Sequence, residues 1–527
     1  MDYSFPYPSQ RMPVMGGNVV ATSQPLAAQA GLQAMADGGN AVDAALAAAI
    51  ALTVVEPTSN GIGGDLFAIV WDGARLHGLN ASGRSPAGLD LARYAGLTEM
   101  PLRGWDAVTV PGAVSGWAAL AERFARLPLT RLAEPAVRYA RHGFPVSPIT
   151  AHHWARAAGV FGGFDAFAEG FLPGGRAPRA GESFAYPAQA STLEEIAATA
   201  GESFYHGRLA EEIAADAARH GAAMTVDDLA AHESEWVDTI ATEYHGSQLH
   251  ELPPNGQGVA ALIALGILRN RAEASAPLDS ADRVHVQLEA MKLALADLAR
   301  YAADPGWMEV GPGDLLDDDY LAQRASLIEP DHAGEPVFGT PRRGGTVYVT
   351  AADDAGMMVS LIQSNYYGFG SGIVVPGTGI AMQNRGSGFV LEAGHPNALA
   401  PGKRPLNTII PGFLMRDGAP LMSFGVMGGA MQAQGHVQMT LRTVDHDQNP
   451  QEASDAPRWR VDAGRSVAVE SGFDAGVVAE LRARGHQITV ASPSEAAGFG
   501  GAQLIRALPS GYVAGSDHRK DGQAVAF

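Results

Sequence analysis

The chain has 527 residues, of which 46% are hydrophobic and 17% are charged, and its formal net charge is −20. This balance is ordinary for a globular protein, so we expect a large apolar core and no extensive disorder. The negative charge disfavours nucleic acid and anionic membranes as partners, and the absence of cysteine excludes thiol nucleophiles, disulfides and cysteine-ligated metals.

The N-terminus and the hydropathy pattern predict a soluble cytoplasmic protein. The first residues, MDYSFPYPSQRMPV, show no basic segment followed by an apolar run, so no secretory signal is predicted. The longest strongly apolar stretch, residues 44–55, is too short to cross a bilayer, which needs roughly 20 residues. No membrane partner is therefore expected.

The first predicted elements are two helices and a β-hairpin. Ser23 is a plausible N-cap for a helix that runs to Ala36, and Asn40 opens a second, alanine-rich helix that ends before Pro57. A glycine loop at residues 60–64 then precedes two strands that are joined by a turn at Asp72 and Gly73.

The centre of the chain, residues 112–300, is predicted to be mostly helical, with its longest helix over residues 284–301. Residues 159–183 are rich in glycine, and they predict a long surface loop. Near residue 345 the pattern changes to two apolar runs around the turn at residues 353–356, which predicts another hairpin. Strands are also expected at 372–375, 412–415, 421–424 and 466–470, and helices at 431–445 and 475–484. Helices around sheets in this order indicate an α+β fold or a layered αββα fold.

Thr346 begins the first strand of this second hairpin, directly after Arg342, Arg343, Gly344 and Gly345. A threonine at the start of a strand is usually only a good β-former. The neighbouring residues and the rest of the chain, however, favour a catalytic role for Thr346.

The chain resembles the γ-glutamyltransferase family of N-terminal nucleophile hydrolases over nearly its whole length. The resemblance rests on the order and spacing of the segments 24–57, 60–64, 109–112, 289–305, 345–384, 403–406, 428–429 and 516–519. It implies an α+β fold in the form of a four-layer αββα sandwich. It also implies self-cleavage before Thr346 into a large chain, residues 1–345, and a small chain, residues 346–527. The two chains would remain together as a heterodimer, with no cofactor and no metal, and a further pairing of heterodimers is left open.

The chemistry of Thr346 agrees with such a cleavage. A free α-amine in a peptide has a pKa of about 7.7–8.0, so cleavage would give the threonine hydroxyl its own base. The cut itself would use the same hydroxyl, which attacks the Gly345 carbonyl in an N-to-O acyl shift. Gly345 suits this step because a residue without Cβ permits close approach.

Further site residues are implied by the resemblance. Gly428 and Gly429 match an oxyanion pair, whose backbone N–H groups would face the developing negative charge. Ser364 matches a hydroxyl residue beside the nucleophile. Arg84 matches the arginine that holds the substrate carboxylate, a role that suits its planar fork. The simpler alternatives are an ordinary glycine turn, a strand serine and a solvated arginine.

Other positions depart from the family pattern. Members that act on γ-glutamyl compounds carry an acidic residue for the substrate amine where this chain has Gly388, and Arg385 replaces a glutamine there. Two family serines become Asn407 and Thr408. A substrate ammonium group beside Arg385 would be repelled.

Tyr366 stands at or beside a position that is asparagine in the family. Asn365, one residue away, could take the place of that asparagine. Together the departures predict a positive pocket without an amine receptor. The expected substrate is a small amide whose acyl group carries a carboxylate, as in the oxamate amidohydrolase-like or cephalosporin acylase-like branches of the family, which would act on oxamate-type and glutaryl-type amides.

Two alternatives remain open from the sequence. The protein could hydrolyse or transfer the γ-glutamyl group of glutathione, or it could be a non-catalytic relative that binds small anions. A metal enzyme is disfavoured because the 16 histidines include no His-Glu-x-x-His pattern. The triplet Asp517-His518-Arg519 is expected to pack the C-terminal tail, since no nucleophile elbow accompanies it.

Overall fold

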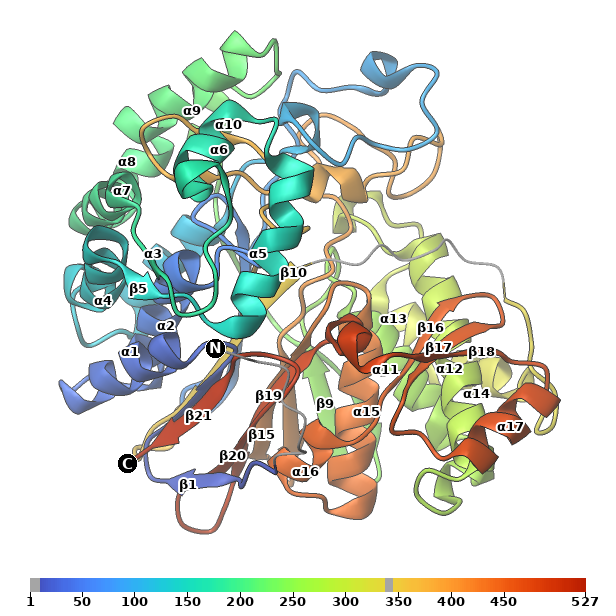
Figure 1. The fold of residues 1–527 in the computed structure, drawn as a ribbon. Coiled ribbons are helices and arrows are strands. Elements are labelled where there is room, and N and C mark those ends of the chain that lie inside the picture. Colours follow the sequence, from blue (N-terminus) through green and yellow to red (C-terminus); the bar gives the residue numbers. More distant parts are fainter. Residues whose placement is uncertain (1–9, 337–344) are drawn as a thin grey trace.

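The structure is a computed structural model that describes residues 10–336 and 345–527. Two seven-stranded sheets, in which every pairing is antiparallel, face each other at its centre (Figure 1). The β10 sheet has the strand order β21 (Gln523–Ala526), β2 (Val19–Thr22), β10 (Gly345–Ala352), β11 (Met358–Tyr366), β3 (Asp65–Trp71), β4 (Leu76–Ala81) and β7 (Glu235–Val237). The β15 sheet has the order β1 (Val14–Gly16), β20 (Tyr512–Ser516), β19 (Gly501–Ala507), β15 (Ala419–Met427), β14 (Gly412–Arg416), β9 (Ser247–Glu251) and β8 (Ile240–Tyr244).

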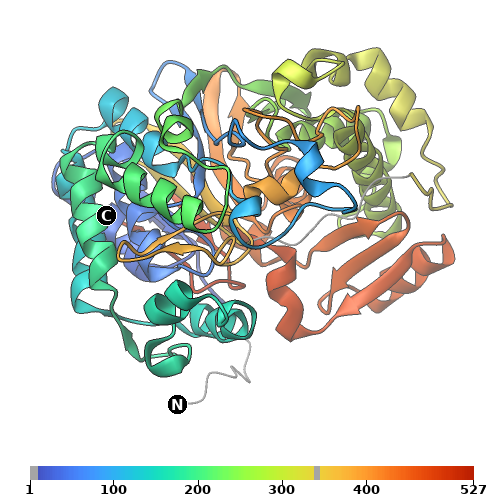
Figure 2. The same ribbon diagram turned by 90° about the horizontal axis from the view of Figure 1, so that it is seen from above.

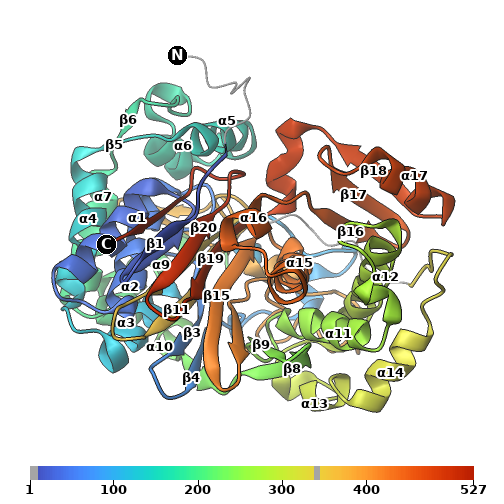
Figure 3. The same cartoon turned by 90° about the horizontal axis from the view of Figure 1, so that it is seen from below.

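Helices cover the outer face of each sheet, which completes four layers (Figures 1 and 3). The β10 sheet is covered by α1 (Pro25–Ala36), α2 (Ala41–Val55) and α3 (Ala113–Phe124), with α4 (Leu129–His142), α5 (Pro148–Phe161), α6 (Asp165–Phe171), α7 (Pro187–Ala198) and α9 (Arg208–Arg219) in the same half. The β15 sheet is covered by α11 (Gly258–Arg269) and α15 (Met431–His446), with α12 (Ala281–Tyr301), α14 (Asp318–Ser326) and α16 (Pro450–Asp455) beside them. The predicted αββα sandwich is thereby confirmed.

A smaller sheet with its own helix lies at the edge of the α12 half (Figure 3). It consists of β16 (Trp459–Ala463), β17 (Ser466–Glu470), β18 (Gln487–Ala491) and α17 (Ala475–Ala483). The remaining short α-helices and strands are α8 (Glu202–Tyr205), α10 (Val226–Ala230), α13 (Pro312–Leu315), β5 (Phe144–Pro145), β6 (Ser183–Phe184), β12 (Val374–Val375) and β13 (Ile380–Ala381). Within the two described ranges, no helix is long and apolar enough to cross a membrane.

The three largest apolar clusters of the described residues correspond to the spaces between the four layers. Strand β10 shows the alternation that this requires, because side chains of a strand point to opposite faces in turn. Val347 and Val349 pack against the helices over the β10 sheet, whereas Tyr348 packs between the two sheets. Thr346, two residues before Tyr348, shares its face and therefore points between the sheets.

Two local predictions are wrong. The N-cap of α1 is Gln24, whose side chain accepts hydrogen bonds from the backbone N–H groups of Leu26 and Ala27, while the Ser23 hydroxyl donates to Glu56. The stretch 159–183 is not one loop, because it includes the end of α5 and all of α6. Phe167 and Phe171 of α6 pack against Phe369, an aromatic cluster that overrides the glycine-rich composition.

Candidate active site

Three polar side chains form a row across the inner face of the β10 sheet. Ser364 on β11 lies beside Thr346 on β10 and directly opposite Asp65 on β3. The residues two positions along each strand, which share this face, all belong to the core between the sheets; they are Tyr348, Ile362 and Phe67. Because neighbouring strands lie about 4.8 Å apart, the row spans about 10 Å.

The Thr346 hydroxyl is held from two sides. Its Oγ1 atom lies 3.3 Å from the Ser364 hydroxyl, and it accepts a hydrogen bond of 3.3 Å from Nε2 of Gln432. Ser364 itself accepts a 2.7 Å hydrogen bond from the backbone N–H of Tyr366. Thr346 is 1% exposed, so these contacts fix the hydroxyl within the protein interior.

The backbone around Thr346 is irregular. The register of β10 and β11 shifts between Gly345 and Val347, so that Ser364 and Asn365 together oppose Thr346. Such a bulge bends a strand and redirects its side chains. Tyr366, next along the chain, has a φ of 74°, a value that is uncommon for a residue with a side chain.

Gly428 and Gly429 connect the end of β15 to the start of α15, the helix that carries Gln432. Their φ values are 125° and 63°, a region that glycine adopts without steric conflict. Nε2 of Gln257 holds this turn by donating to the carbonyls of Gly429 and Thr408, at 2.8 and 2.5 Å. The start of α15 also places the positive end of a helix dipole near Thr346.

Arg385 is the buried cation of the site, with an exposed fraction of 0%. Its Nη1 atom donates to the Thr408 hydroxyl at 2.8 Å, and its guanidinium carbon lies 4.3 Å from the centre of the Tyr366 ring. Its Nε and Nη2 atoms have no hydrogen-bond partner among the described residues. Burial lowers the pKa of Arg385 to about 10, although the charge of Asp65 opposes this shift, so Arg385 is cationic at neutral pH.

Asp65 supplies the counter-charge, since its Oδ2 atom lies 3.9 Å from Nε of Arg385. Both oxygens of Asp65 already accept hydrogen bonds, from the backbone N–H of Gly83 at 3.2 Å, Nε2 of Gln383 at 3.0 Å and Nδ2 of Asn407 at 3.1 Å. Burial raises the pKa of Asp65 to about 6, and the charge of Arg385 partly opposes this shift. The charge of Arg385 is therefore compensated at pH 7, contrary to the expected positive pocket.

The other expected pocket residues lie around this pair. Asn407 and Thr408 contact Asp65 and Arg385 respectively, and Tyr366 stacks on Arg385. Asn365 packs against the glycine loop, where a Cβ atom on Gly61 or Gly64 would lie 2.8 or 2.7 Å from its amide group. The glycines of residues 60–64 therefore allow close packing beneath the site.

Arg84 has a different environment. Its guanidinium forms ion pairs with Asp304 at 3.0 Å and with Glu235 at 3.2 Å, and it also donates to the Gly402 carbonyl. The side chain is 43% exposed. Its chain neighbour Gly83 reaches Asp65, but the guanidinium itself is already engaged by acceptors, and its predicted contact with a substrate stays a prediction.

The segment after β4, which carries Arg84, is joined above the sheets to the segment before β14, which carries Asn407 and Thr408 (Figure 2). The backbone N–H of Ser85 donates to the Lys403 carbonyl, and Nε of Arg404 donates to the Ser82 carbonyl. The segment after β4 and the segment before β14 are thus joined by hydrogen bonds.

Sequence reasoning missed Asp65 and Gln432. Asp65 directly follows the glycine loop at the start of a predicted strand, and Gln432 falls three residues after the Gly428-Gly429 pair in the first turn of a predicted helix. Their positions, next to the glycine loop and the Gly428-Gly429 pair, were the only signs in the sequence that these two residues belong to the site. Their roles depend on contacts with residues more than 80 positions away along the chain.

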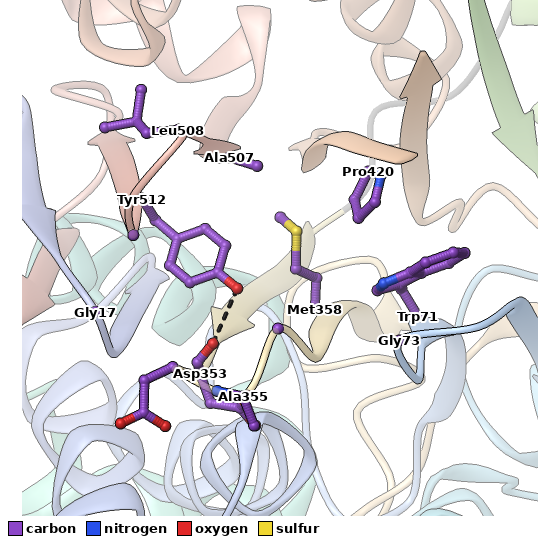
Figure 4. Close-up of a pocket in the computed structure, with 13 residues that line it drawn as sticks. Gly17, Trp71, Gly73, Asp353, Ala355, Met358, Pro420, Ala507, Leu508 and Tyr512 are labelled. Atoms are coloured by element: carbon purple, nitrogen blue, oxygen red, sulfur yellow. Dashed lines mark hydrogen bonds between the residues drawn. The ribbon is translucent and has the colours of Figure 1, made fainter. Parts of the chain in front are cut away.

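One group of described residues has a geometry that could hold a metal ion, namely His285, Glu289 and His486. It lies outside the Thr346 site, and the Lys292 ammonium already pairs with Glu289 there. A cavity of about 430 Å³ lies at the turn of the β10–β11 hairpin, where the Tyr512 hydroxyl donates to the Asp353 carbonyl (Figure 4). It is about 20 Å along the strand from Thr346, and none of the site residues lines it.

Comparisons with known proteins show similarity over nearly the whole chain. The gamma-glutamyltranspeptidase family matches residues 27–527 of the chain. The chain is 35% identical to a glutathione hydrolase-like YwrD proenzyme of Bacillus subtilis, over 97% of this chain and 100% of that protein, and 37% identical to an oxamate amidohydrolase proenzyme of Klebsiella pneumoniae, over 95% and 97%. The crystal structure of a cephalosporin acylase from Bacillus halodurans superposes with a TM-score of 0.96, at 47% identity, over 100% of this chain and 99% of the other.

Proposed function

The chain belongs to the gamma-glutamyltranspeptidase family, and we propose that it is a self-processing amidohydrolase that cleaves an amide bond of a small, carboxylate-bearing substrate through Thr346. The observation that carries this proposal is the arrangement at Thr346, whose hydroxyl is buried, held by Ser364 and Gln432, and preceded by Gly345 in the chain. The relatives named as proenzymes support processing.

In the proposed self-cleavage, the Thr346 oxygen attacks the Gly345 carbonyl carbon. The C–N bond breaks, an ester forms, and the nitrogen takes the proton that the hydroxyl loses. Water then hydrolyses the ester, which leaves a carboxylate on Gly345 and a free amine on Thr346. Gly428 and Gly429 are proposed to stabilise the oxyanion of these steps through their backbone N–H groups.

Hydrolysis of the substrate follows the same pattern. The free amine of Thr346 takes the hydroxyl proton, and the oxygen attacks the amide carbonyl of the substrate. The proton then passes to the departing amine, so an acyl ester of Thr346 and a free amine result. Water hydrolyses this ester, releases the acid and restores the hydroxyl.

The two proposed products would stay together because strands of both are paired within each sheet. In the β10 sheet, β10 and β11 of residues 346–527 lie between β2 and β3 of residues 1–345. In the β15 sheet, β14 pairs with β9 and β20 pairs with β1 across the same division. A cut before Thr346 would thus leave two chains that share both sheets and the core.

The acyl carboxylate is proposed to bind Arg385. The Nε–Nη2 edge of a guanidinium matches the two oxygens of a carboxylate, and these are the two donors of Arg385 without a partner among the described residues. An unmade hydrogen bond of a buried donor costs about 1–3 kcal/mol, so a ligand that supplies acceptors is favoured. The oxygens of Asp65, in contrast, already accept bonds, which favours an acyl group with a carboxylate and without an amine.

Oxamate-type and glutaryl-type amides both fit this description, and relatives named oxamate amidohydrolase and cephalosporin acylase support them. A second candidate is hydrolysis or transfer of a γ-glutamyl group, as the name of the glutathione hydrolase-like relative suggests. Its structural support is Asp65, an acid 3.9 Å from Arg385, because the two charges together could meet the α-amine and the α-carboxylate of a glutamyl group.

Intact-mass measurements on the wild type, Thr346→Ala and Thr346→Ser test the mechanism. We expect two masses divided between residues 345 and 346 for the wild type and for the serine variant, which keeps a hydroxyl, and one mass for the alanine variant. Turnover of an oxamate, a glutaryl amide and a γ-glutamyl amide then separates the substrates. A wild type that stays in one piece and hydrolyses none of them would overturn the proposal.

A further inference from the structure

Gln432 contacts the proposed nucleophile through a side chain whose orientation the structure defines. It is fully buried in the first turn of α15, and its Oε1 atom accepts a 3.0 Å hydrogen bond from the backbone N–H of Ile410. A reversed carboxamide would place its NH₂ group against this N–H, two donors together. The group that faces Oγ1 of Thr346 at 3.3 Å is therefore the donor, Nε2.

This donor restricts the proton of the Thr346 hydroxyl. Since Oγ1 accepts from Gln432, its own hydrogen points away from Nε2. The other side-chain contact of Oγ1 is with the Ser364 hydroxyl, in which either oxygen can be the donor. When the hydroxyl loses its proton during attack, the oxygen gains negative charge, and a hydrogen bond to a charged acceptor is about twice as strong as a neutral one. The Nε2–H of Gln432 would therefore stabilise the attacking oxygen more than the resting hydroxyl.

We propose that Gln432 is a further catalytic residue, which orients and stabilises the attacking oxygen of Thr346 in self-cleavage and in substrate hydrolysis. This inference rests on the proposed role of Thr346 as nucleophile. It differs from the oxyanion role of Gly428 and Gly429, because it acts on the attacking oxygen and not on the carbonyl oxygen of the substrate. Removal of this one donor is expected to slow both reactions about 10- to 100-fold.

The simpler interpretation is that Gln432 only ties α15 to the backbone at Ile410. The same helix offers a matched control, because Gln434 is also fully buried and its carboxamide bonds Val461 at both ends, at 2.8 and 3.1 Å. Within the described part of the chain, the hydrogen bonds of the Gln434 side chain go to Val461 and Ala430 and not to Thr346. If Gln432 were only structural, Gln432→Met and Gln434→Met would have similar effects.

The test follows the appearance of the small chain during cell-free synthesis of the wild type, Gln432→Met, Gln432→Glu and Gln434→Met, together with kcat, KM and the melting temperature of the products. We expect both methionine variants to melt at similar temperatures, and only Gln432→Met to cleave and turn over slowly, with kcat more affected than KM. Rates for Gln432→Met within about twofold of wild type would overturn the inference.

Gln432→Glu provides a readout that a structural role would not change. A protonated carboxyl can donate to Thr346 while its other oxygen accepts from Ile410, whereas an ionised carboxylate cannot donate. The self-cleavage rate of this variant, divided by the wild-type rate at the same pH, should rise as the pH falls through the pKa of the new carboxyl. A ratio that does not change with pH contradicts the inference. If the wild type neither cleaves nor hydrolyses, the proposed function itself fails, and the role of Gln432 fails with it.

Discussion

Replacement of Arg385 is the most informative perturbation of the proposed substrate pocket. Arg385→Met removes the two donors, Nε and Nη2, that have no hydrogen-bond partner among the described residues. It also removes the hydrogen bond from Nη1 to Thr408 and the positive charge beside Asp65. Two hydrogen bonds to a charged group contribute about 1.5–3 kcal/mol each, or about 3–6 kcal/mol together. At about 1.36 kcal/mol per factor of ten, kcat/KM should fall about 10²- to 10⁴-fold.

The assay compares a glutaryl amide with the butyryl amide of the same amine, which lacks the terminal carboxylate. The wild type should prefer the glutaryl compound, and Arg385→Met should lose most of this preference while it keeps its slow turnover of the butyryl amide. Arg385→Lys, which keeps a charge without the planar fork, should lie between the two. A methionine variant that retains the full preference would refute the assignment of Arg385 as the carboxylate receptor.

Four further results are expected. Ser364→Ala should slow self-cleavage about tenfold or more in mass measurements, because the Thr346 hydroxyl loses one of its two side-chain contacts. As the pH falls from 7 to 5, Asp65, whose pKa burial raises to about 6, takes up a proton and leaves Arg385 uncompensated. KM for a carboxylate substrate should therefore fall over this range, and Asp65→Asn should remove this dependence. Gly428→Ala should lower both kcat and the melting temperature, since φ is 125° and the new Cβ would lie 3.1 Å from Cα of Gly500. Arg84→Met should change kcat/KM less than Arg385→Met does, because Asp304 and Glu235 already hold Arg84; a larger loss than that of Arg385→Met would make Arg84 the receptor.

The sequence predicted most elements because their signals are local. Asn40 caps α2 as expected, and the turn at residues 353–356 joins β10 and β11. The start of α1 was missed by one residue, because the side chain of Gln24 reaches the N–H groups at the start of the helix and Ser23 bonds the distant Glu56 instead. A cap of this kind depends on which partner is nearest in the folded chain, which a local pattern does not reveal.

The sequence by itself determined the family, the layered fold and the position of Thr346 after Gly345, since these follow from residues that are adjacent or regularly spaced in the chain. Only the tertiary structure decided how the pocket is charged and how the hydroxyl is held. Asp65 meets Arg385, and Gln432 meets Thr346, across more than 80 residues of chain. The physical reason is that sheet pairing and the facing of the two sheets bring distant side chains within hydrogen-bond range, and burial there sets their charges and pKa values.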